Sequence, residues 1–195
     1  MMVPEPFLQS LLRHIQLTEP QQELLADALK KRLVRRKQFL LQEGEQQQHA
    51  IFVLSGCLRS YSIDRNGFEH ILQFAPSGWW IADMRSYLKQ EPATLYIDAV
   101  EDSEVLLLPR TSLDRLLEQI PPLERFFRIL AENALATYQH RLIEHLSLPA
   151  KDRYRQFCQT YPGLTEQLPQ KLVASYIGVT PEFLSKMLRQ ENGKK

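Results

Sequence analysis

The segment QKLVASYIGVTPEFLSKMLR, residues 170–189, constrains the fold of this chain more than any other stretch. Gly178 falls where a first helix must end in a left-handed conformation, which glycine adopts without steric cost. Thr180 can cap a second helix, and Pro181 falls on its first position, where no amide donor is missed. The positions that two such helices would turn toward each other are apolar or small: Val173, Ala174, Ile177, Val179, Leu184 and Met187. The spacing predicts a helix-turn-helix.

The outward side of the second predicted helix carries side chains that suit contacts with DNA bases. Glu182 can accept from a cytosine amino group, Lys186 can donate to guanine, and Phe183 can press on a thymine methyl. Residues near the helix starts can contact phosphate and set the register. The predicted DNA-contacting residues are Gln170, Lys171, Thr180, Glu182, Phe183, Ser185, Lys186 and Arg189. The alternative is a helical hairpin with a polar outer face.

The charge distribution favours a polyanion as the partner of this end of the chain. The whole chain has a net charge of only +1, but residues 148–195 hold eight basic and four acidic residues. Such asymmetry is typical of a protein that meets nucleic acid at one end, although a solvated basic tail is the alternative. A second basic run, Lys30 to Lys37, is interpreted as the solvent-facing end of a helix, where cations complement the helix dipole.

Residues 39–110 have the pattern of short strands separated by turns. The candidate strands are IFVLSG, CLRSYSI, FEHILQFA, TLYIDAVE and SEVLLLP. Asn66-Gly67 between two of them indicates a hairpin, because both residues tolerate positive φ. Many short strands at this spacing favour a sandwich or barrel. The first forty residues are predicted to be helical, with Thr18 as an N-cap paired with Gln21.

Two helices are predicted after the strands. Thr111 can cap the first, TSLDRLLEQI, and Pro121-Pro122 interrupts the chain before the second, LERFFRILAENALATYQHRLIEHL. One stripe of this long helix carries Leu123, Phe127, Leu130, Ala134, Tyr138, Leu142 and His145 or Leu146. Such a stripe ordinarily packs on the protein's own core, but its length without glycine or proline also favours pairing with the same helix of a second subunit.

The order of a β-rich domain, a long helix and a C-terminal helix-turn-helix resembles the CRP/FNR family of bacterial transcription regulators over nearly the whole chain. Four further motifs carry the resemblance: EGE at 43–45, VLSGCLRSY at 53–61, DRNG at 64–67 and AVEDSEVL at 99–106. The resemblance implies an α+β fold with an N-terminal β jelly roll of the cyclic-nucleotide-binding type, a long dimerisation helix and a C-terminal winged helix-turn-helix. The implied divisions are 1–121 for the sensor domain, 122–146 for the dimerisation helix and 147–195 for the DNA-binding domain.

The same resemblance implies the partners. They are a second copy of the chain bound through the long helix, a two-fold symmetric double-stranded DNA operator, and RNA polymerase. Only ENGKK follows the reading helix in this sequence, so a β-hairpin wing would be short or absent. No apolar run of eighteen residues and no basic-then-apolar leader are present, so we expect a cytoplasmic protein and no membrane partner.

Relatives that bind a cyclic nucleotide share a cassette in which a glycine precedes a glutamate for the ribose, and an Arg-Ser or Arg-Thr pair holds the phosphate. Laid over this chain, Gly78 is kept, the glutamate position falls on Trp79, and the later pair falls near Ala93-Thr94. A buried phosphate without a cationic partner is costly. We therefore predict that the chain does not bind cyclic AMP in the family's usual way.

The candidate residues for an unidentified small-molecule effector are Gly78, Trp79, Trp80, Arg85, Thr94 and Tyr96. Two interpretations of the tryptophans stay open: they line a pocket for a flatter, less charged molecule, or they fill an obsolete pocket. Two cysteines, Cys57 and Cys158, are too few for an oxygen-sensing cluster, and the five histidines show no ligand pattern. A haem held by a single histidine stays open, but no cofactor or metal site is predicted.

No catalytic residues are predicted. An enzyme needs a nucleophile with an oriented base, paired carboxylates or a glycine-rich phosphate loop, and none occurs at a recognisable spacing. The competing interpretation is a ligand-binding or protein-interaction module of the same fold that does not bind DNA. Charge reversal at Lys186 and Arg189 separates the two, because only a DNA-binding protein would lose operator affinity.

Overall fold

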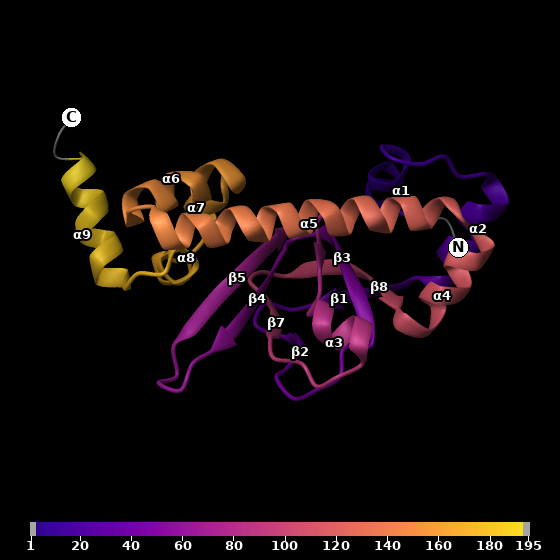
Figure 1. The fold of residues 1–195 in the computed structure, drawn as a ribbon, viewed down its shortest axis with the longest axis horizontal. Coiled ribbons are helices and arrows are strands. Elements are labelled where there is room, and N and C mark those ends of the chain that lie inside the picture. The colour runs from indigo at the N-terminus through magenta and orange to yellow at the C-terminus, as the bar shows by residue number, and fades with distance from the viewer. Residues whose placement is uncertain (1–2, 193–195) are drawn as a thin grey trace. The chain divides into compact units, whose positions relative to one another are not determined.

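The computed structural model describes residues 3–192, which form two compact units (Figure 1). The first, here called the β unit, runs to Ser62 and continues over Leu72–Ala131. The second, here called the helical unit, comprises Ile63–Ile71 and the chain from Glu132 onward. The division of the chain into sensor, dimerisation and DNA-binding segments remains a prediction.

The β unit is built on two four-stranded sheets. One has the order β1-β8-β3-β6, and the other has the order β2-β7-β4-β5. The strands are β1 (Lys30–Val34), β2 (Phe39–Leu41), β3 (His49–Ser55), β4 (Cys57–Ile63), β5 (Glu69–Pro76), β6 (Trp80–Ile81), β7 (Tyr96–Ala99) and β8 (Ser103–Pro109). The helices are α1 (Glu5–Leu12), α2 (Glu19–Ala28), α3 (Met84–Lys89) and α4 (Arg110–Gln119). All five strands expected from the sequence are present.

Strand β3 separates two hydrophobic cores, because successive side chains of a strand point to opposite faces. Ile51 and Val53 point between the two sheets, where they join Leu58 and Ile97 from the second sheet. Phe52 points to the other face, into a core shared with helical side chains. That core is completed by α1, α2, α4 and the first turns of the long helix α5 (Pro122–Ser147), which lie together in Figure 1.

The interpretation of the basic run after residue 30 as a helix end was wrong. Lys30–Val34 forms strand β1, which pairs with β8 in antiparallel register. Lys31 lies 2.9 Å from the Glu104 carboxylate across this pair. Alternation then buries Val34 while Leu33 stays 76% exposed. Pairing with a strand about seventy residues later in the chain overrides the local charge pattern, which carries no information about that partner.

One predicted turn and one predicted helix cap also differ from expectation. The hairpin at Asn66-Gly67 forms, but only Gly67 takes positive φ, at 80°. The Asp64 carboxylate organises the turn by accepting from the amides of Asn66 and Phe68 at 2.8 and 3.0 Å. Thr111 is not a cap, since α4 begins at Arg110 with Pro109 in the cap position. The expected cap at Thr18 is supported by Gln21, whose side-chain oxygen accepts from the Thr18 amide at 3.0 Å.

The helical unit contains the rest of α5 and four shorter helices. These are α6 (Ala150–Thr160), α7 (Leu164–Gln167), α8 (Gln170–Ile177) and α9 (Pro181–Asn192). The long helix expected at 122–146 is therefore confirmed. Phe157, Tyr161 and Tyr176 form the aromatic centre of the unit, with ring centroids 5.1 to 5.6 Å apart. The place where a wing would follow α9 lies outside the described residues.

Candidate nucleic-acid interface and effector region

The turn between α8 and α9 has the geometry that the sequence predicts. Gly178 ends α8 in the left-handed conformation, with φ 71° and ψ 43°. The amide of Val179 donates back to the carbonyl of Ala174 at 3.0 Å, which closes the end of the helix. Thr180 caps α9, since its Oγ1 accepts from the Phe183 amide at 3.2 Å. The facing side chains Val173, Ala174, Ile177 and Leu184 are buried. The helix-turn-helix geometry is thus formed by local signals and a small apolar contact.

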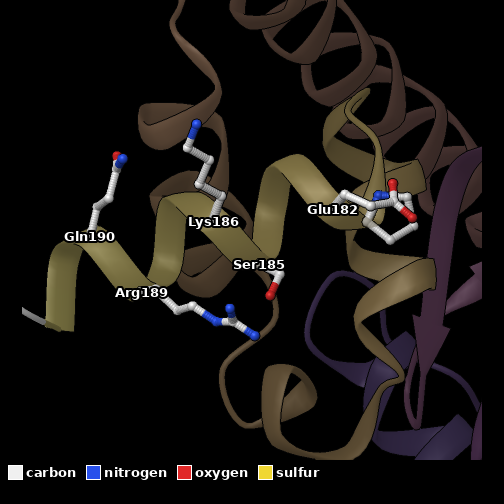
Figure 2. A pocket seen from close by; sticks show the side chains of 6 residues that line it. Glu182, Ser185, Lys186, Arg189 and Gln190 are labelled. Atoms are coloured by element: carbon white, nitrogen blue, oxygen red, sulfur yellow. The ribbon is translucent and has the colours of Figure 1, made fainter.

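A shallow hollow lies along the solvent-facing side of α9. Its lining residues are Pro181, Glu182, Ser185, Lys186, Arg189 and Gln190. Figure 2 shows Lys186 and Gln190 projecting to one side of the helix in this view, and Ser185 and Arg189 to the other. Gln190 was missed by the sequence reasoning because an uncharged amide late in a helix gives no signal of its own.

The other residues predicted to contact DNA lie around this hollow or at the start of α8. Gln170 and Lys171 occupy the first turn of α8 and are exposed. Phe183 is 52% exposed on α9 although it is a large apolar side chain. The surface therefore offers carboxylate, hydroxyl, ammonium, guanidinium and aromatic groups on one short helix, and these are the groups that read base edges in a major groove.

The two tryptophans of the candidate effector region enter different cores. Trp80 packs with Phe7, Phe52 and Phe127, with ring centroids 5.4 to 5.9 Å apart. Trp79 packs against the core between the sheets. Gly78, with φ 86°, and Trp79 are tied through their backbones to Val53. Trp80 begins β6 and Trp79 directly precedes that strand, and the two adjacent side chains pack against different cores, which supports the core-filling interpretation of this pair.

Thr94 is engaged by an acidic residue that the sequence reasoning missed. The buried carboxylate of Asp83 accepts from the Thr94 amide at 2.9 Å and lies 3.4 Å from the Thr94 hydroxyl. It also caps α3 by accepting from the Ser86 amide at 3.0 Å. An aspartate before a short helix is a readable N-cap signal. Of the pair that the resemblance assigns to a cyclic phosphate only the Thr94 hydroxyl is present, and it already lies beside this carboxylate, so the residues present do not fit that group.

Arg85 and Tyr96, two further candidate effector residues, contact other side chains. Arg85 is 65% exposed in its side chain and pairs with Glu91 at 2.7 Å. Tyr96 stacks on Tyr61, with ring centroids 5.3 Å apart, and its hydroxyl donates to Glu43 at 3.3 Å. Desolvation raises the pKa of Tyr96, and the Glu43 carboxylate raises it further. These partners, Glu91, Tyr61 and Glu43, are not among the six candidate effector residues.

A buried ion pair next to Tyr61 was also missed. The guanidinium of Arg59 on β4 donates to both carboxylate oxygens of Asp98 on β7, at 2.7 and 2.9 Å. Tyr61 donates to the same carboxylate at 3.3 Å, and Arg59 lies 4.2 Å over the Tyr61 ring. Both partners of the pair are nearly buried, at 11% and 7% exposure. Such a bidentate pair fixes the register of two strands and acts as a structural link between them.

Neither a metal centre nor a membrane span is found within residues 3–192. No three or more His, Cys, Asp or Glu side chains of the described chain gather in a group that could hold a metal ion. In the same range, every helix is too short or too polar to cross a bilayer. Burial raises the pKa of the Cys57 thiol to about 12, so this cysteine is a poor nucleophile.

Comparison with known proteins gives consistent results. Residues 31–120 match the family model of the cyclic nucleotide-binding domain. Over 171 residues the chain is 23% identical to the regulatory protein HlyX of Actinobacillus pleuropneumoniae, a match that covers 82% of this chain and 70% of that protein. The fold is similar to that of the c-di-GMP responsive global regulator CLP of Xanthomonas campestris, with a TM-score of 0.75, 13% identity, and coverage of 91% of this chain and 93% of that one. It is also similar to a structure from Eubacterium rectale assigned to the crp/fnr family of transcriptional regulators, with a TM-score of 0.73, 16% identity, and coverage of 91% and 85%.

The described chain has a double-sheet domain of the cyclic-nucleotide-binding type, followed by a long helix and two short helices joined by a glycine turn. Residues 31–120 thus match the cyclic nucleotide-binding domain, and the chain is similar to regulators of the CRP/FNR type. The α+β jelly-roll fold that the sequence indicated is confirmed. HlyX and CLP are themselves regulators.

Proposed function

We propose that this chain is a sequence-specific DNA-binding transcription regulator that acts as a homodimer on a two-fold symmetric operator. The observation that carries the proposal is α9, which follows a capped glycine turn and presents Glu182, Lys186 and Arg189 to solvent. A helix of this size fits the major groove, where a carboxylate can accept from cytosine and an ammonium group can donate to guanine. Lys171 and Gln170 at the start of α8 then contact phosphate.

The long helix supports the homodimer. Its first turns pack into the core of the β unit through Leu123 and Phe126. Farther along, large apolar side chains are exposed at helical spacing: Leu135, Tyr138, Leu142, Ile143 and Leu146, of which Leu146 is 80% exposed. An apolar stripe of this length on an exposed helix favours pairing with its twin. The first turns of the helix thus pack on the core of the β unit, and the exposed later part is proposed to pair with a second subunit.

The effector is proposed to be something other than cyclic AMP, and its identity remains open. The Asp83 carboxylate stands beside Thr94, and a second anion there would be repelled at short range. Titration calorimetry should show no micromolar binding of cyclic AMP to the wild-type chain. Micromolar binding that is abolished by Thr94→Ala would contradict this. In keeping with the family, the chain is also proposed to contact RNA polymerase and to act in the cytoplasm.

The experiment that tests the main proposal is selection of bound sequences from a random double-stranded DNA library. We expect enrichment of a two-fold symmetric site whose half-sites lie about one helical turn apart. Lys186→Glu combined with Arg189→Glu should abolish binding to the selected site. The matched control is Lys89→Glu, an exposed lysine at the end of α3, which should bind as the wild type does.

A protein-interaction module of the same fold is the second candidate. It would give no enriched DNA sequence, and its charge-reversed variant would behave as the wild type does. Exposed Phe183, a large apolar side chain within the candidate interface, is the observation that favours it. The library selection therefore decides between the two candidates in one experiment.

A further inference from the structure

Two half-buried arginines hold the C-terminal end of α8, immediately before the turn that leads to α9. Arg141 on α5 donates through Nη2 to the carbonyl oxygen of Tyr176 at 2.9 Å. Arg153 on α6 donates through Nε to the carbonyl oxygen of Ile177 at 2.8 Å. The last carbonyls of a helix lack partners within the helix, and cations stabilise them further through the helix dipole.

Each guanidinium also holds a second group. Arg153 donates through Nη1 to the Leu148 carbonyl at 2.9 Å, which ties the start of α6 to the end of α8. Arg141 lies 3.8 Å over the Tyr176 ring and donates to the Ile71 carbonyl at 2.6 Å. A guanidinium can bond in several directions and stack at once, whereas an ammonium group cannot stack in this way and has no planar fork. The arrangement therefore depends on the shape of the side chain as well as its charge.

Helix α8 is also tied to the β4–β5 hairpin of the same unit. The Ser175 hydroxyl donates to the Glu69 carbonyl at 2.6 Å and accepts from the Ile71 amide at 3.1 Å. Ile71 is thus bonded through its amide to Ser175 and through its carbonyl to Arg141. Contacts from α5, α6 and the hairpin together hold the C-terminal end of α8 in position.

These arginines differ from the cations that face solvent on the helix-turn-helix. Lys171, Lys186 and Arg189 line the solvent-facing surface, whereas Arg141 and Arg153 are half-buried and bonded to backbone carbonyls. We propose that Arg141 and Arg153 are positioning residues for DNA reading. They hold the end of α8, and thereby the turn from which α9 starts, and they do not contact phosphate. This inference rests on the proposed DNA-binding function.

Arg153→Lys tests the inference, because it keeps the charge and removes the fork. We expect operator affinity to fall about tenfold, the order of effect of removing a hydrogen bond to a charged group. The slope of log affinity against log salt concentration should stay at its wild-type value, since the number of neutralised phosphates is unchanged. The reference variant is Lys171→Ala, which should reduce the slope by about 0.9 for each phosphate that is no longer neutralised. Arg153→Gln removes the charge as well as the fork. If Arg153→Lys bound the operator as tightly as the wild type and Arg153→Gln reduced the slope, Arg153 would be a phosphate contact and the proposal would be overturned.

The ratio of operator affinity to random-sequence affinity separates positioning from partial unfolding. Misplaced base-reading side chains lower this ratio, whereas a smaller folded fraction lowers both affinities equally. We expect the ratio to fall in Arg153→Lys and in Arg141→Lys. An unchanged ratio in both variants would refute a positioning role.

Amide hydrogen exchange of the free protein provides a readout that needs no DNA. Exchange at Val179 should be faster in Arg153→Lys than in the wild type. The matched control is Arg155→Lys on the same helix, whose exposed side chain pairs with Asp152 at 3.0 Å and should leave Val179 unchanged. If exchange rises but the wild type selects no DNA sequence, the DNA-binding proposal fails and the hold on α8 stands. If exchange is unchanged, the inference about the arginines fails by itself.

Discussion

The Ser175 hydroxyl donates a hydrogen bond to the carbonyl oxygen of Glu69, 106 residues earlier in the chain, at 2.6 Å. The same hydroxyl accepts from the Ile71 amide. A small side chain on the first helix of the helix-turn-helix therefore meets both the donor and the acceptor of a strand that enters the second sheet. This places a single hydroxyl at the junction of the hairpin and α8.

Ser175→Ala is expected to destabilise the chain by about 1–2 kcal/mol, because it leaves a part-buried amide and carbonyl without their partner. Urea unfolding monitored by circular dichroism measures the change. Ser147→Ala is the matched control, since the Ser147 hydroxyl is exposed and bonds only within its own helix, to Ile143. Equal stability of the two variants would show that the link to the hairpin contributes nothing.

Stability of the helical unit is expected to fall on mild acidification because of His145. Its ring lies 3.4 Å from the position that a side chain on Gly178 would occupy. Burial lowers the pKa of His145 below its ordinary value of 6.5, and the positive charges of Arg141 and Arg153 lower it further, while the bond with Tyr176 acts in the opposite direction. The folded state then binds fewer protons than the unfolded state. The contribution of His145 to the free energy of unfolding is therefore fully present above about pH 6.5. It is lost as the pH falls from there toward the lowered pKa of His145.

Urea midpoints at about pH 7.5 and about pH 5.5 measure this dependence. His145→Gln should flatten this dependence. Burial also lowers the pKa of His49 in the β unit, so His49→Gln isolates that contribution. An unaltered pH dependence in His145→Gln would contradict the assignment.

Leu142→Arg is expected to give a monomer at micromolar concentration, where the wild type is proposed to be a homodimer. Leu142 is 60% exposed on the apolar stripe of α5, and a charge there would be buried without a partner in a paired helix. Light scattering measures the mass. Leu33→Arg on β1 is the matched control, because Leu33 is exposed outside the stripe and its substitution should leave the dimer intact. A dimeric Leu142→Arg would place the interface elsewhere.

Asp83→Ala is expected to cost about 3 kcal/mol of stability, since it removes both the cap of α3 and the acceptor for the Thr94 amide. Thermal or urea unfolding measures the loss. Asp83→Asn keeps an acceptor oxygen and should retain much of the stability. A small effect of Asp83→Ala would indicate that water replaces the carboxylate and that the site is open enough to admit another anion.

Local signals predicted the parts of the fold that depend on local sterics. Gly178, Thr180 and Pro181 define a helix end and a helix start within a few residues of one another, so the turn before α9 was readable. The same is true of the alternating apolar strands and of the long helix that starts after Pro121. The outward residues of α9 follow from this geometry, and the hollow along α9 brings four of them together.

Contacts between distant segments were not readable. Lys30–Val34 became a strand because β8 pairs with it, and Asp83 meets Thr94 because the chain folds back between them. The basic residues after Ser147 suggested a surface for a polyanion, yet Arg153 is bonded to a carbonyl 24 residues later. Composition reports how many charges a segment has, but it does not report which of them face solvent.

Steric and capping rules act over a few residues, so they were enough to predict the glycine turn and the long helix. Long-range contacts of the folded chain determine which cations face solvent, which of them hold the end of α8, and which acidic group lies at Thr94. Those assignments depend on burial and on backbone partners far along the chain, such as Thr94 for Asp83 and Tyr176 for Arg141.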